Sequence, residues 1–247
     1  MKVAVCISGV IKLGNSLGSL QKYNQRIKEK FPNADFYYAT WNNYKDEFTK
    51  TFPEEKGYFF NEPVIPYHPY IDMKKEDAIS HHFIKRIEWA KNLSNDKKVW
   101  TSHHTKQMLI HAYLLKQIPE CDIIVRARFD SFINKNANFA PYVEDTYSTG
   151  TIHGFAVTKP NMFNEFYDSP MKSGSKHENF MLDQLIIHRY DTFDPDNVLE
   201  LHEQNKLHPA EWGWYQTLSY PGVNHKNHHG YINHDKNVLE KFMREHL

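Results

Sequence analysis

The chain has 247 residues, and its 30 lysine and arginine residues are balanced by 30 aspartate and glutamate residues. That length allows one large domain with a substantial apolar core, whereas a net charge near zero argues against a general polyanion-coating role. With 16 Phe, 15 Tyr and 5 Trp but only 10 Gly, the chain has many rings to bury or to stack on flat ligands.

The chain opens with the short apolar run "MKVAVCISG", which ends at Ser8–Gly9 before it reaches the length of a signal-peptide core. No run approaches the roughly 20 apolar residues that a membrane helix needs. We therefore expect a cytoplasmic protein without a membrane span. Cys6 and Cys121 each lie in an apolar run, which favours two buried thiols in a reducing cytosol over a disulfide or a metal site.

The first 43 residues predict a strand, a loop, a helix and a second strand. Residues 3–7 are apolar, residues 20–31 carry apolar side chains at helical spacing, and residues 34–41 again resemble a strand. Such crossovers connect parallel strands, so we expect an α/β fold, a mostly parallel sheet with helices on both faces in a single domain. Ligands of such sheets bind at the carboxyl ends of strands, which here are Ser8–Gly9 and Trp41–Asn42.

The rest of the chain continues this alternation after an irregular, proline-rich excursion over residues 52–77. Apolar periodicity predicts helices over residues 101–118, 177–190, 208–220 and in the tail from residue 233. Two further strands are predicted over residues 122–130 and 150–159.

The stretch "CDIIVRARFDSFI", residues 121–133, begins as apolar sheet core and turns abruptly charged. Alternation along a strand would place Arg126, Arg128 and Asp130 on one side if the strand persists. One interpretation is an ion-pair cluster that ties a strand edge to a neighbouring helix. The other is a ligand site, because guanidinium groups form paired bonds to phosphate and a carboxylate suits a hard cation such as Mg²⁺ or Mn²⁺.

At this point the sequence resembles a known family. The segments "VAVCISG", "ADFYYATWNN", "KQMLIHAYLLKQ" and "CDIIVRARFD" are similar to those of GT-A-type glycosyltransferases from polysaccharide and lipopolysaccharide loci and from large phages. The resemblance covers roughly residues 1–190. It implies a Rossmann-like GT-A fold in one domain over residues 1–247, with a nucleotide-binding half to about residue 133 and an acceptor-side half after it.

The resemblance also implies a donor site. Asp130 stands where GT-A enzymes place the last carboxylate of their metal-binding Asp-x-Asp motif, but Arg128 replaces the first. A divalent cation, Mn²⁺ or Mg²⁺, is therefore expected at Asp130, with Arg126 and Arg128 on the diphosphate of a nucleotide-diphosphate sugar; alternatively, the arginines replace the cation. Ser8, Gly9 and Lys12 would hold the nucleotide, although the family commonly has an arginine near the last of these positions.

An inverting enzyme of this family needs a carboxylate that accepts the proton of the acceptor hydroxyl. Asp183 is the first choice and Glu211 the second; the bland interpretation of Asp183 is a solvent-facing residue of an amphipathic helix. Trp212 and Trp214 follow Glu211 closely and would form either a sugar-stacking platform or buried core.

The 16 histidines include a cluster in "VNHKNHHGYINH". Some GT-A enzymes supply a metal ligand from a C-terminal His followed by Gly, which His229–Gly230 resembles, so His229, or its neighbour His228, is expected to contact metal or diphosphate. A solvated, histidine-rich loop is the alternative. The chain contains no P-loop, GxGxxG or CxxC motif, which weakens several other enzyme classes.

We therefore expect a glycosyltransferase that moves a sugar from a nucleotide-diphosphate sugar to an acceptor hydroxyl. The acceptor would be a polysaccharide or lipopolysaccharide glycan, or a hydroxymethylated base of phage DNA, in the host cytoplasm if a phage encodes the chain. A DNA acceptor would require a basic strip, for which residues 85–98 are the candidate. The alternatives are a non-catalytic nucleotide- or glycan-binding protein of the same fold and a His/Asp metal hydrolase.

Overall fold

The computed structural model describes residues 1–11, 17–65, 95–157, 183–208, 210–218 and 223–232. In these parts of the chain, seven strands form one sheet in the order β3-β2-β1-β4-β6-β5-β7. The strands are β1 Val3–Ser8, β2 Asp35–Trp41, β3 Gly57–Phe60, β4 Ile123–Ala127, β5 Ile152–Val157, β6 Leu185–Arg189 and β7 His225–Ile232.

The sheet is parallel except at β6. Strands β3, β2, β1 and β4 pair in parallel, β6 pairs antiparallel with both β4 and β5, and β7 is parallel to β5. The carboxyl ends of the six co-directional strands therefore share one edge of the sheet with the beginning of β6. We call this edge the carboxyl edge; in open sheets of this kind, ligands bind there.

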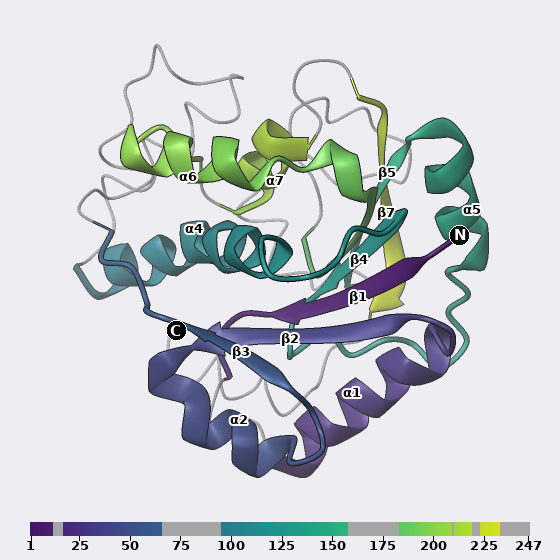
Figure 1. The fold of residues 1–247 in the computed structure, drawn as a ribbon, viewed down its shortest axis with the longest axis horizontal. Coiled ribbons are helices and arrows are strands. Elements are labelled where there is room, and N and C mark those ends of the chain that lie inside the picture. The colour runs from purple at the N-terminus through teal and green to yellow at the C-terminus, as the bar shows by residue number, and fades with distance from the viewer. Residues whose placement is uncertain (12–16, 66–94, 158–182, 209, 219–222, 233–247) are drawn as a thin grey trace.

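Helices cover both faces of the sheet (Figure 1). Helices α1, α2 and α5 cover one face, here called the α1 face, and helices α4, α6 and α7 cover the other, the α4 face. Their bounds are α1 Leu17–Lys30, α2 Lys45–Thr51, α4 Asn95–Leu115, α5 Ala140–Thr149, α6 Pro195–Glu203 and α7 Ala210–Leu218, with single 3-10 turns at Asn42–Tyr44 and Tyr190–Thr192.

The two faces bury different kinds of side chain. On the α1 face, the buried ring of Phe48 packs against several others, including Phe52 at 5.5 Å and Phe129 at 6.2 Å between ring centroids. On the α4 face, Trp41 and Trp214 are buried together with polar residues such as His111. The first face is an apolar core, whereas the second combines core with buried polar groups that require an explanation.

The expected fold, a mostly parallel sheet with helices on both faces, is confirmed. The strands expected near residues 3–7, 34–41, 122–130 and 150–159 are present as β1, β2, β4 and β5, and the helices expected over residues 20–31, 101–118 and 208–220 as α1, α4 and α7. The predicted tail helix lies outside the described residues.

The helix expected over residues 177–190 is wrong, because β6 occupies Leu185–Arg189. Its Leu-Ile-Ile run is compatible with either periodicity, and pairing with β4 and β5 makes it a central strand, buried on both faces. The histidine-rich segment expected as a loop contains the strand β7. Within the irregular excursion, β3 pairs with β2 at the other end of the sheet.

The two cysteines are free thiols. Cys6 lies in the middle of β1 and is fully buried, whereas Cys121, just before β4, is half-buried. Burial raises the pKa of both thiols, that of Cys121 to about 11. In the described part of the chain, no helix combines the length and apolarity that a membrane crossing requires.

Candidate active site at the carboxyl edge

The chain turns sharply as it leaves β4 at the carboxyl edge. The backbone N–H of Arg128 donates to Ser131 Oγ at 3.0 Å, and the N–H of Ser131 donates back to the Arg128 carbonyl at 3.1 Å. Ser131 Oγ in turn donates to the carbonyl of Gln184 at 2.5 Å, just before β6. This turn, residues Arg128–Ser131, is therefore fixed to the beginning of the antiparallel strand.

Arg128 and Asp130 form a two-bond ion pair within the turn. Arg128 Nε donates to Asp130 Oδ1 at 2.8 Å, and Nη2 donates to Oδ2 at 2.7 Å. Both side chains are about one quarter exposed, so a ligand at the edge can reach them. The ion-pair interpretation of the sequence is realised for these two residues, in a geometry that also suits exchange with a phosphate.

Arg126 lies below the edge rather than on it. Its side chain is fully buried on the α4 face, where its guanidinium donates to the Asp183 carbonyl and, at 2.8 Å, to Gln107 Oε1. The guanidinium also lies 4.8 Å from the ring centroid of Trp214. Burial lowers the pKa of Arg126 to about 10, with Asp183 partly opposing this effect. Arg126 is thus a fixed positive charge that holds the beginning of β6, and a ligand at the surface does not reach it in this conformation.

Ser8 and Gly9 lie at the end of β1. Ser8 is fully buried, and its hydroxyl has no hydrogen-bond partner among the residues that the structure describes. Gly9 has a φ of 134°, a conformation that L side chains rarely adopt, and a Cβ at this position would meet no atom within 4 Å. The backbone is held by a bond from Gly9 N to the Ala39 carbonyl at 3.2 Å and from Thr40 Oγ1 to the Gly9 carbonyl at 2.9 Å.

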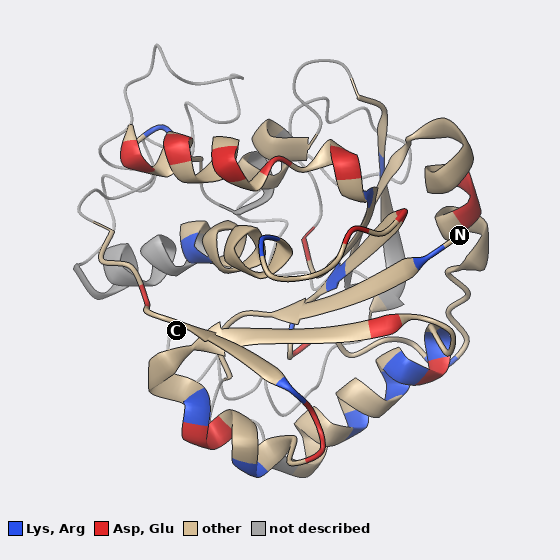
Figure 2. Ribbon diagram, viewed as in Figure 1, with Lys and Arg blue, Asp and Glu red and all other residues tan. Residues whose placement is uncertain are grey.

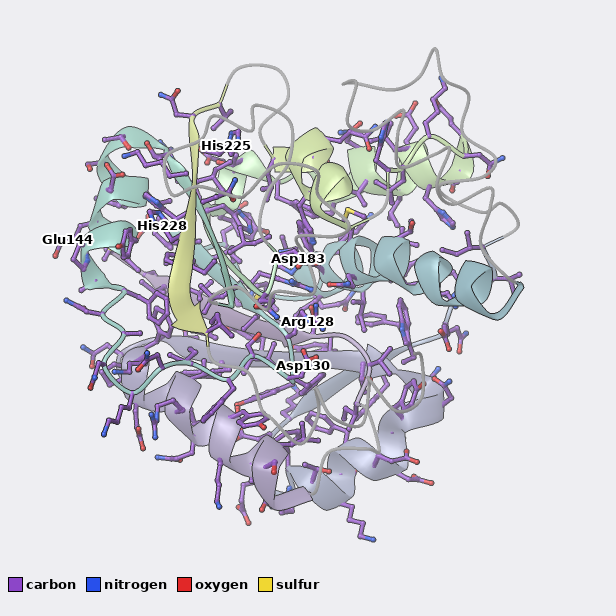
Figure 3. The ribbon with its side chains drawn as sticks, turned by 180° about the vertical axis from the view of Figure 1, so that it is seen from behind. Arg128, Asp130, Glu144, Asp183, His225 and His228 are labelled. Carbon is purple, nitrogen blue, oxygen red and sulfur yellow. The ribbon has the colours of Figure 1, made fainter. Side chains whose placement is uncertain are left out.

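The structure brings some of the predicted site residues together. Figure 3 shows Arg128, Asp130 and Asp183 along the same edge of the sheet. Asp183 precedes β6 and is only 7% exposed, so it is not the solvent-facing helical residue of the bland interpretation. Its position results from the reversed direction of β6, which puts the first residues of that strand beside the last residues of β4.

Other predicted residues lie elsewhere or outside the described parts. Lys12 is outside the described residues, and so are residues 85–94 of the candidate basic segment. Glu211 belongs to α7 and His229 to β7, but the structure does not describe their side chains. Because β7 is three strands from β4 in the sheet order, the two strands are about 14 Å apart at ordinary strand spacing.

The described residues do not by themselves form a divalent-cation site. Both carboxylate oxygens of Asp130 accept bonds from Arg128, and within the described part of the chain no three His, Cys, Asp or Glu side chains are grouped suitably for a metal ion. Hard cations need several oxygen ligands. The cation expected at Asp130 and His229 therefore remains a prediction, and no chemical step below depends on it.

Sequence reasoning missed two parts of the arrangement. Gln107, on α4, was treated only as part of a helix, although its side chain binds Arg126. Asp145 and His153 received no role, yet they join His228 in a second polar cluster on α5, β5 and β7. No motif marks these contacts, because they depend on how α4 and α5 cross the sheet.

Comparisons with known proteins support the fold. No family model and no curated protein matches the sequence. Among solved structures, a protein assigned as a glucose-1-phosphate thymidylyltransferase from Bacillus anthracis matches 100% of this chain and 96% of its own, at 7% identity and a TM-score of 0.51.

Glycosyltransferases are also among the structural neighbours. Core-mannan synthase A from Aspergillus fumigatus, in a Mn/GDP form, matches with a TM-score of 0.47 and 12% identity over 94% of this chain and 74% of its own. A galactosyltransferase in complex with donor and acceptor sugar analogues matches with a TM-score of 0.45 and 10% identity over 91% and 73%. Scores below 0.5 carry no functional conclusion. The likeness to the thymidylyltransferase, at 7% identity, establishes the shared Rossmann-like fold and nothing further.

Proposed function

We propose that this chain is a glycosyltransferase that transfers a sugar from a nucleotide-diphosphate sugar to an acceptor hydroxyl. The observation that carries this proposal is the meeting of Arg128, Asp130 and Asp183 at the carboxyl edge. Ser8, with a buried hydroxyl that has no partner among the described residues, lies at the end of β1 on the same edge. Such edges are where open α/β sheets bind nucleotides.

The proposed chemistry breaks the bond between the sugar and the diphosphate and forms a bond from the sugar to the acceptor oxygen. Arg128 would exchange its bond to Asp130 for the diphosphate oxygens, where it stabilises the charge that develops on the leaving group. For an inverting enzyme, the carboxylate of Asp183 would accept the hydroxyl proton, with Glu211 as the second candidate.

Ser8, Gly9 and Lys12 would hold the nucleotide in this proposal. The open space beside Gly9 and its left-handed backbone favour close approach of a ligand to the main chain. Arg126 would act through Asp183, because it binds the carbonyl of that residue from below. A divalent cation, Mn²⁺ or Mg²⁺, would have to recruit Asp130 after Arg128 has left it.

Two classes of acceptor are candidates: a polysaccharide or lipopolysaccharide glycan, and a hydroxymethylated base in phage DNA. The basic residues drawn in Figure 2 include a group on α1, whereas α6 carries acidic ones. A DNA acceptor would be recognised by binding to duplex DNA that weakens steeply with salt. Binding to a glycan should change little between low and high salt.

The decisive experiment is a thermal-shift screen of nucleoside diphosphates and nucleotide sugars, each with and without Mn²⁺. A donor at 100 times its Kd adds about 2.7 kcal/mol of stability, which raises the Tm of a chain of this size by roughly 5–10 °C. If no nucleotide raises the Tm under either condition, the proposed donor site is wrong.

A product assay then separates the reactions that this fold supports. Release of nucleoside diphosphate from the donor in the presence of acceptor supports a glycosyltransferase. Release of pyrophosphate from a nucleoside triphosphate and a sugar phosphate would instead indicate a nucleotidyltransferase. Binding without either product would favour the non-catalytic alternative, to which the intact Arg128–Asp130 pair also lends weight.

A further inference from the structure

Arg126 is a buried cation whose hydrogen-bond partners, in the part of the chain that the structure describes, are neutral groups. Its side chain is fully buried near the carboxyl end of β4. Nη1 donates to the backbone carbonyl of Asp183, and Nη2 donates to Oε1 of Gln107 at 2.8 Å. Nε has no partner among the described residues. The guanidinium is therefore fixed in position, but no hydrogen-bonded carboxylate of the described chain balances its charge.

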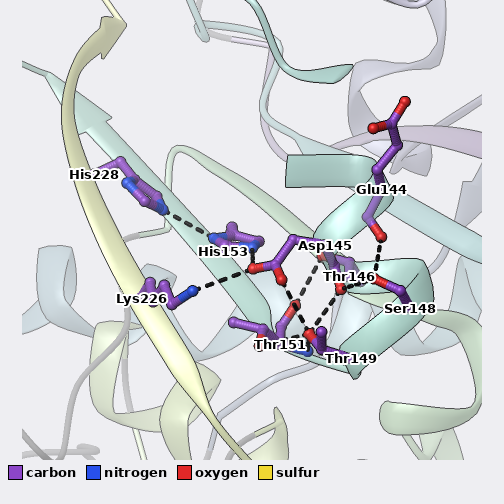
Figure 4. Close-up of polar contacts among 9 residues, drawn as sticks. All are labelled: Glu144, Asp145, Thr146, Ser148, Thr149, Thr151, His153, Lys226 and His228. Atoms are coloured by element: carbon purple, nitrogen blue, oxygen red, sulfur yellow. Dashed lines mark hydrogen bonds and ion pairs between the residues drawn. The ribbon is translucent and has the colours of Figure 1, made fainter. Parts of the chain in front are cut away.

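The second polar cluster, on α5, β5 and β7, contains a charge that is balanced (Figure 4). Asp145 Oδ2 accepts a hydrogen bond from Lys226 Nζ at 3.2 Å, and it lies 3.0 Å from Nε2 of the buried His153. The anion thus has a cation beside it. An ion that leaves water without such a partner costs more free energy than one that is paired. By this comparison, Arg126 is an exception that requires an explanation.

The charge of Arg126 lies directly below the proposed donor site. Arg128 is two residues further along the chain, about 7 Å at the rise of a strand, and β4 ends between them at Ala127. Burial lowers the pKa of Arg126 to about 10, Asp183 partly opposes this effect, and the charges of Arg128 and Asp130 act on it in opposite directions. Arg126 is therefore still charged at pH 7, and it is close enough to interact with the charges at the carboxyl edge.

The surroundings of Arg126 keep water away from this charge. The guanidinium lies 4.8 Å from the ring centroid of Trp214, whose side chain is also fully buried. Charges interact more strongly across such a region than across water, and salt screens them less. A cation below the edge can therefore attract an anion at the edge without touching it.

Gln107, on α4, determines whether the charge of Arg126 stays unbalanced. Its amide oxygen fixes the guanidinium without adding a negative charge. A glutamate has nearly the same size and would accept the same hydrogen bond, but its carboxylate would pair with the guanidinium and cancel the charge. The position is half-buried, so a carboxylate would fit there. The amide thus holds Arg126 in place and preserves its electric field.

We propose that Gln107 and Arg126 are positioning residues of the donor site: Gln107 holds Arg126 as an unbalanced buried cation, and this charge attracts the diphosphate of the donor to the carboxyl edge. Contact with the diphosphate belongs to Arg128, which is partly exposed. Arg126 also binds the backbone of Asp183, so the same cation sets the position of the proposed base. This inference rests on the function proposed above and adds to it a cation that acts without contact.

Two variants of Gln107 separate the charge of Arg126 from its hydrogen bond. Gln107→Glu keeps the bond but cancels the charge. It should raise the urea midpoint at pH 7, because a buried cation gains a counter-ion. It should also weaken the binding of inorganic pyrophosphate about tenfold, the effect expected of a unit charge about 10 Å away at an effective dielectric constant of about 20.

Gln107→Met removes the acceptor but leaves the charge. It should lower the urea midpoint, because a buried donor loses its partner, and it should weaken pyrophosphate binding by less than about threefold. Calorimetric titration at a fixed Mg²⁺ concentration measures the affinity, and urea unfolding without ligand measures the stability. Gln107→Glu should therefore be the most stable of the three proteins and the weakest binder.

Gln117→Glu is the matched control. It makes the same change of charge at an exposed position just beyond the end of α4, about 15 Å further along the helix axis. Its affinity should stay within about twofold of that of the natural protein. The inference is overturned if Gln107→Glu also binds pyrophosphate within twofold of the natural protein, or if affinity follows stability across the Gln107 variants, as a purely structural role requires.

The result can be separated from a failure of the proposed function. If the natural protein binds pyrophosphate and releases nucleoside diphosphate from a donor while Gln107→Glu is unaffected, the glycosyltransferase stands and only the role of the buried charge is wrong. If the natural protein binds neither pyrophosphate nor any nucleotide, the donor site is wrong, and this inference is overturned with it.

Discussion

Two Arg-x-Asp pairs lie at the ends of neighbouring strands of the sheet, and they lie on opposite edges because β6 runs antiparallel to β4. Arg128 binds Asp130 after β4, and Arg189 binds Asp191 after β6 through a 2.8 Å contact. The first pair is about one quarter exposed, whereas the side chains of the second are 45% and 65% exposed.

The two pairs consist of the same residue types at the same spacing, but Arg128 makes two bonds to its aspartate and Arg189 makes one. Their surroundings also differ. The Arg128 pair sits in a turn fixed to the beginning of β6, near Asp183 and the buried Arg126. The Arg189 pair lies at the opposite edge, where the carboxyl ends of the parallel strands do not converge. The Arg189–Asp191 pair is therefore an internal control for the Arg128–Asp130 pair. The Arg128 pair is expected to bind ligand, whereas the Arg189 pair is expected to be an exposed surface ion pair without a ligand.

The largest expected effect separates the pairs by turnover. Arg128→Ala should lower the rate of sugar transfer by about 10²–10³-fold, the usual cost of removing one group that stabilises developing charge. Arg189→Ala should leave the rate within twofold of the natural protein. Nucleoside diphosphate release under saturating donor measures both, and equal rates for the two variants would remove Arg128 from the site.

Lowering the pH should decrease the free energy of unfolding through two buried histidines on the α4 face, without involving either Arg-x-Asp pair. Burial lowers the pKa of His188 to about 4, and that of His111 falls well below its usual value for the same reason. Both are neutral when folded, so their stability contribution is present above the unfolded pKa of about 6.5 and is lost as the pH falls toward 4. His188 alone should cost about 3 kcal/mol over this window.

Urea unfolding between pH 7 and pH 4.5 measures this loss. His111→Phe is the matched variant, because neither nitrogen of His111 has a partner among the described residues and its ring packs against Phe193 and Trp214. It should retain its stability at pH 7 and flatten the dependence on pH. A slope as steep as that of the natural protein would mean that His111 does not titrate as described.

A smaller effect is expected from the turn that distinguishes the Arg128 pair. Ser131→Ala removes a hydroxyl that bonds both Arg128 N and the Gln184 carbonyl, and leaving buried groups unpaired costs about 1–3 kcal/mol. The exposed Ser148, which bonds a carbonyl of its own helix, is the control, and Ser148→Ala should change stability by less than about 0.5 kcal/mol. Equal losses in the two variants would show that the turn is not a fixed element.

The smallest effect concerns the exposed pair itself. Removing Arg189 or Asp191 should change the free energy of unfolding by about 0–1 kcal/mol, and high salt should erase the change, because exposed ion pairs are screened. Urea midpoints at low and high salt test this. A loss that persists in high salt would mean that this edge also has a structural role.

The sequence predicts the parts of the fold whose apolar pattern is unambiguous. Strands β1 and β4 begin as continuous apolar runs, and α4 shows helical spacing. Strand β6 was assigned to a helix because Leu185, Ile186 and Ile187 fit either element, and only its two antiparallel neighbours decide the question. Strand β7 was missed because its residues are largely polar, as an edge strand permits.

The sequence predicts where the candidate site lies in the fold, but not how its side chains are arranged. The charged end of β4 was visible in the sequence, and the parallel topology brings it to the same edge as Ser8. The sequence does not reveal that β4 ends at Ala127, after which Arg128 and Asp130 turn toward one another while Arg126 remains in the core. Nor does it reveal that Asp183 lies just before a reversed strand.

The two thiols differ in burial, so their rates of reaction with a thiol reagent report different opening motions of the protein. Cys6, fully buried in the middle of β1, can react with a thiol reagent only when the centre of the sheet comes apart, so its labelling rate follows global unfolding. Cys121 is half-buried at the beginning of β4 and donates a weak bond to the Ile123 carbonyl at 3.5 Å, so it should label through local fraying. Timed alkylation of the natural protein can be followed by mass spectrometry with and without a candidate nucleotide. A nucleotide that binds at the carboxyl edge should slow the labelling of Cys6, so binding would be detected without any engineered label.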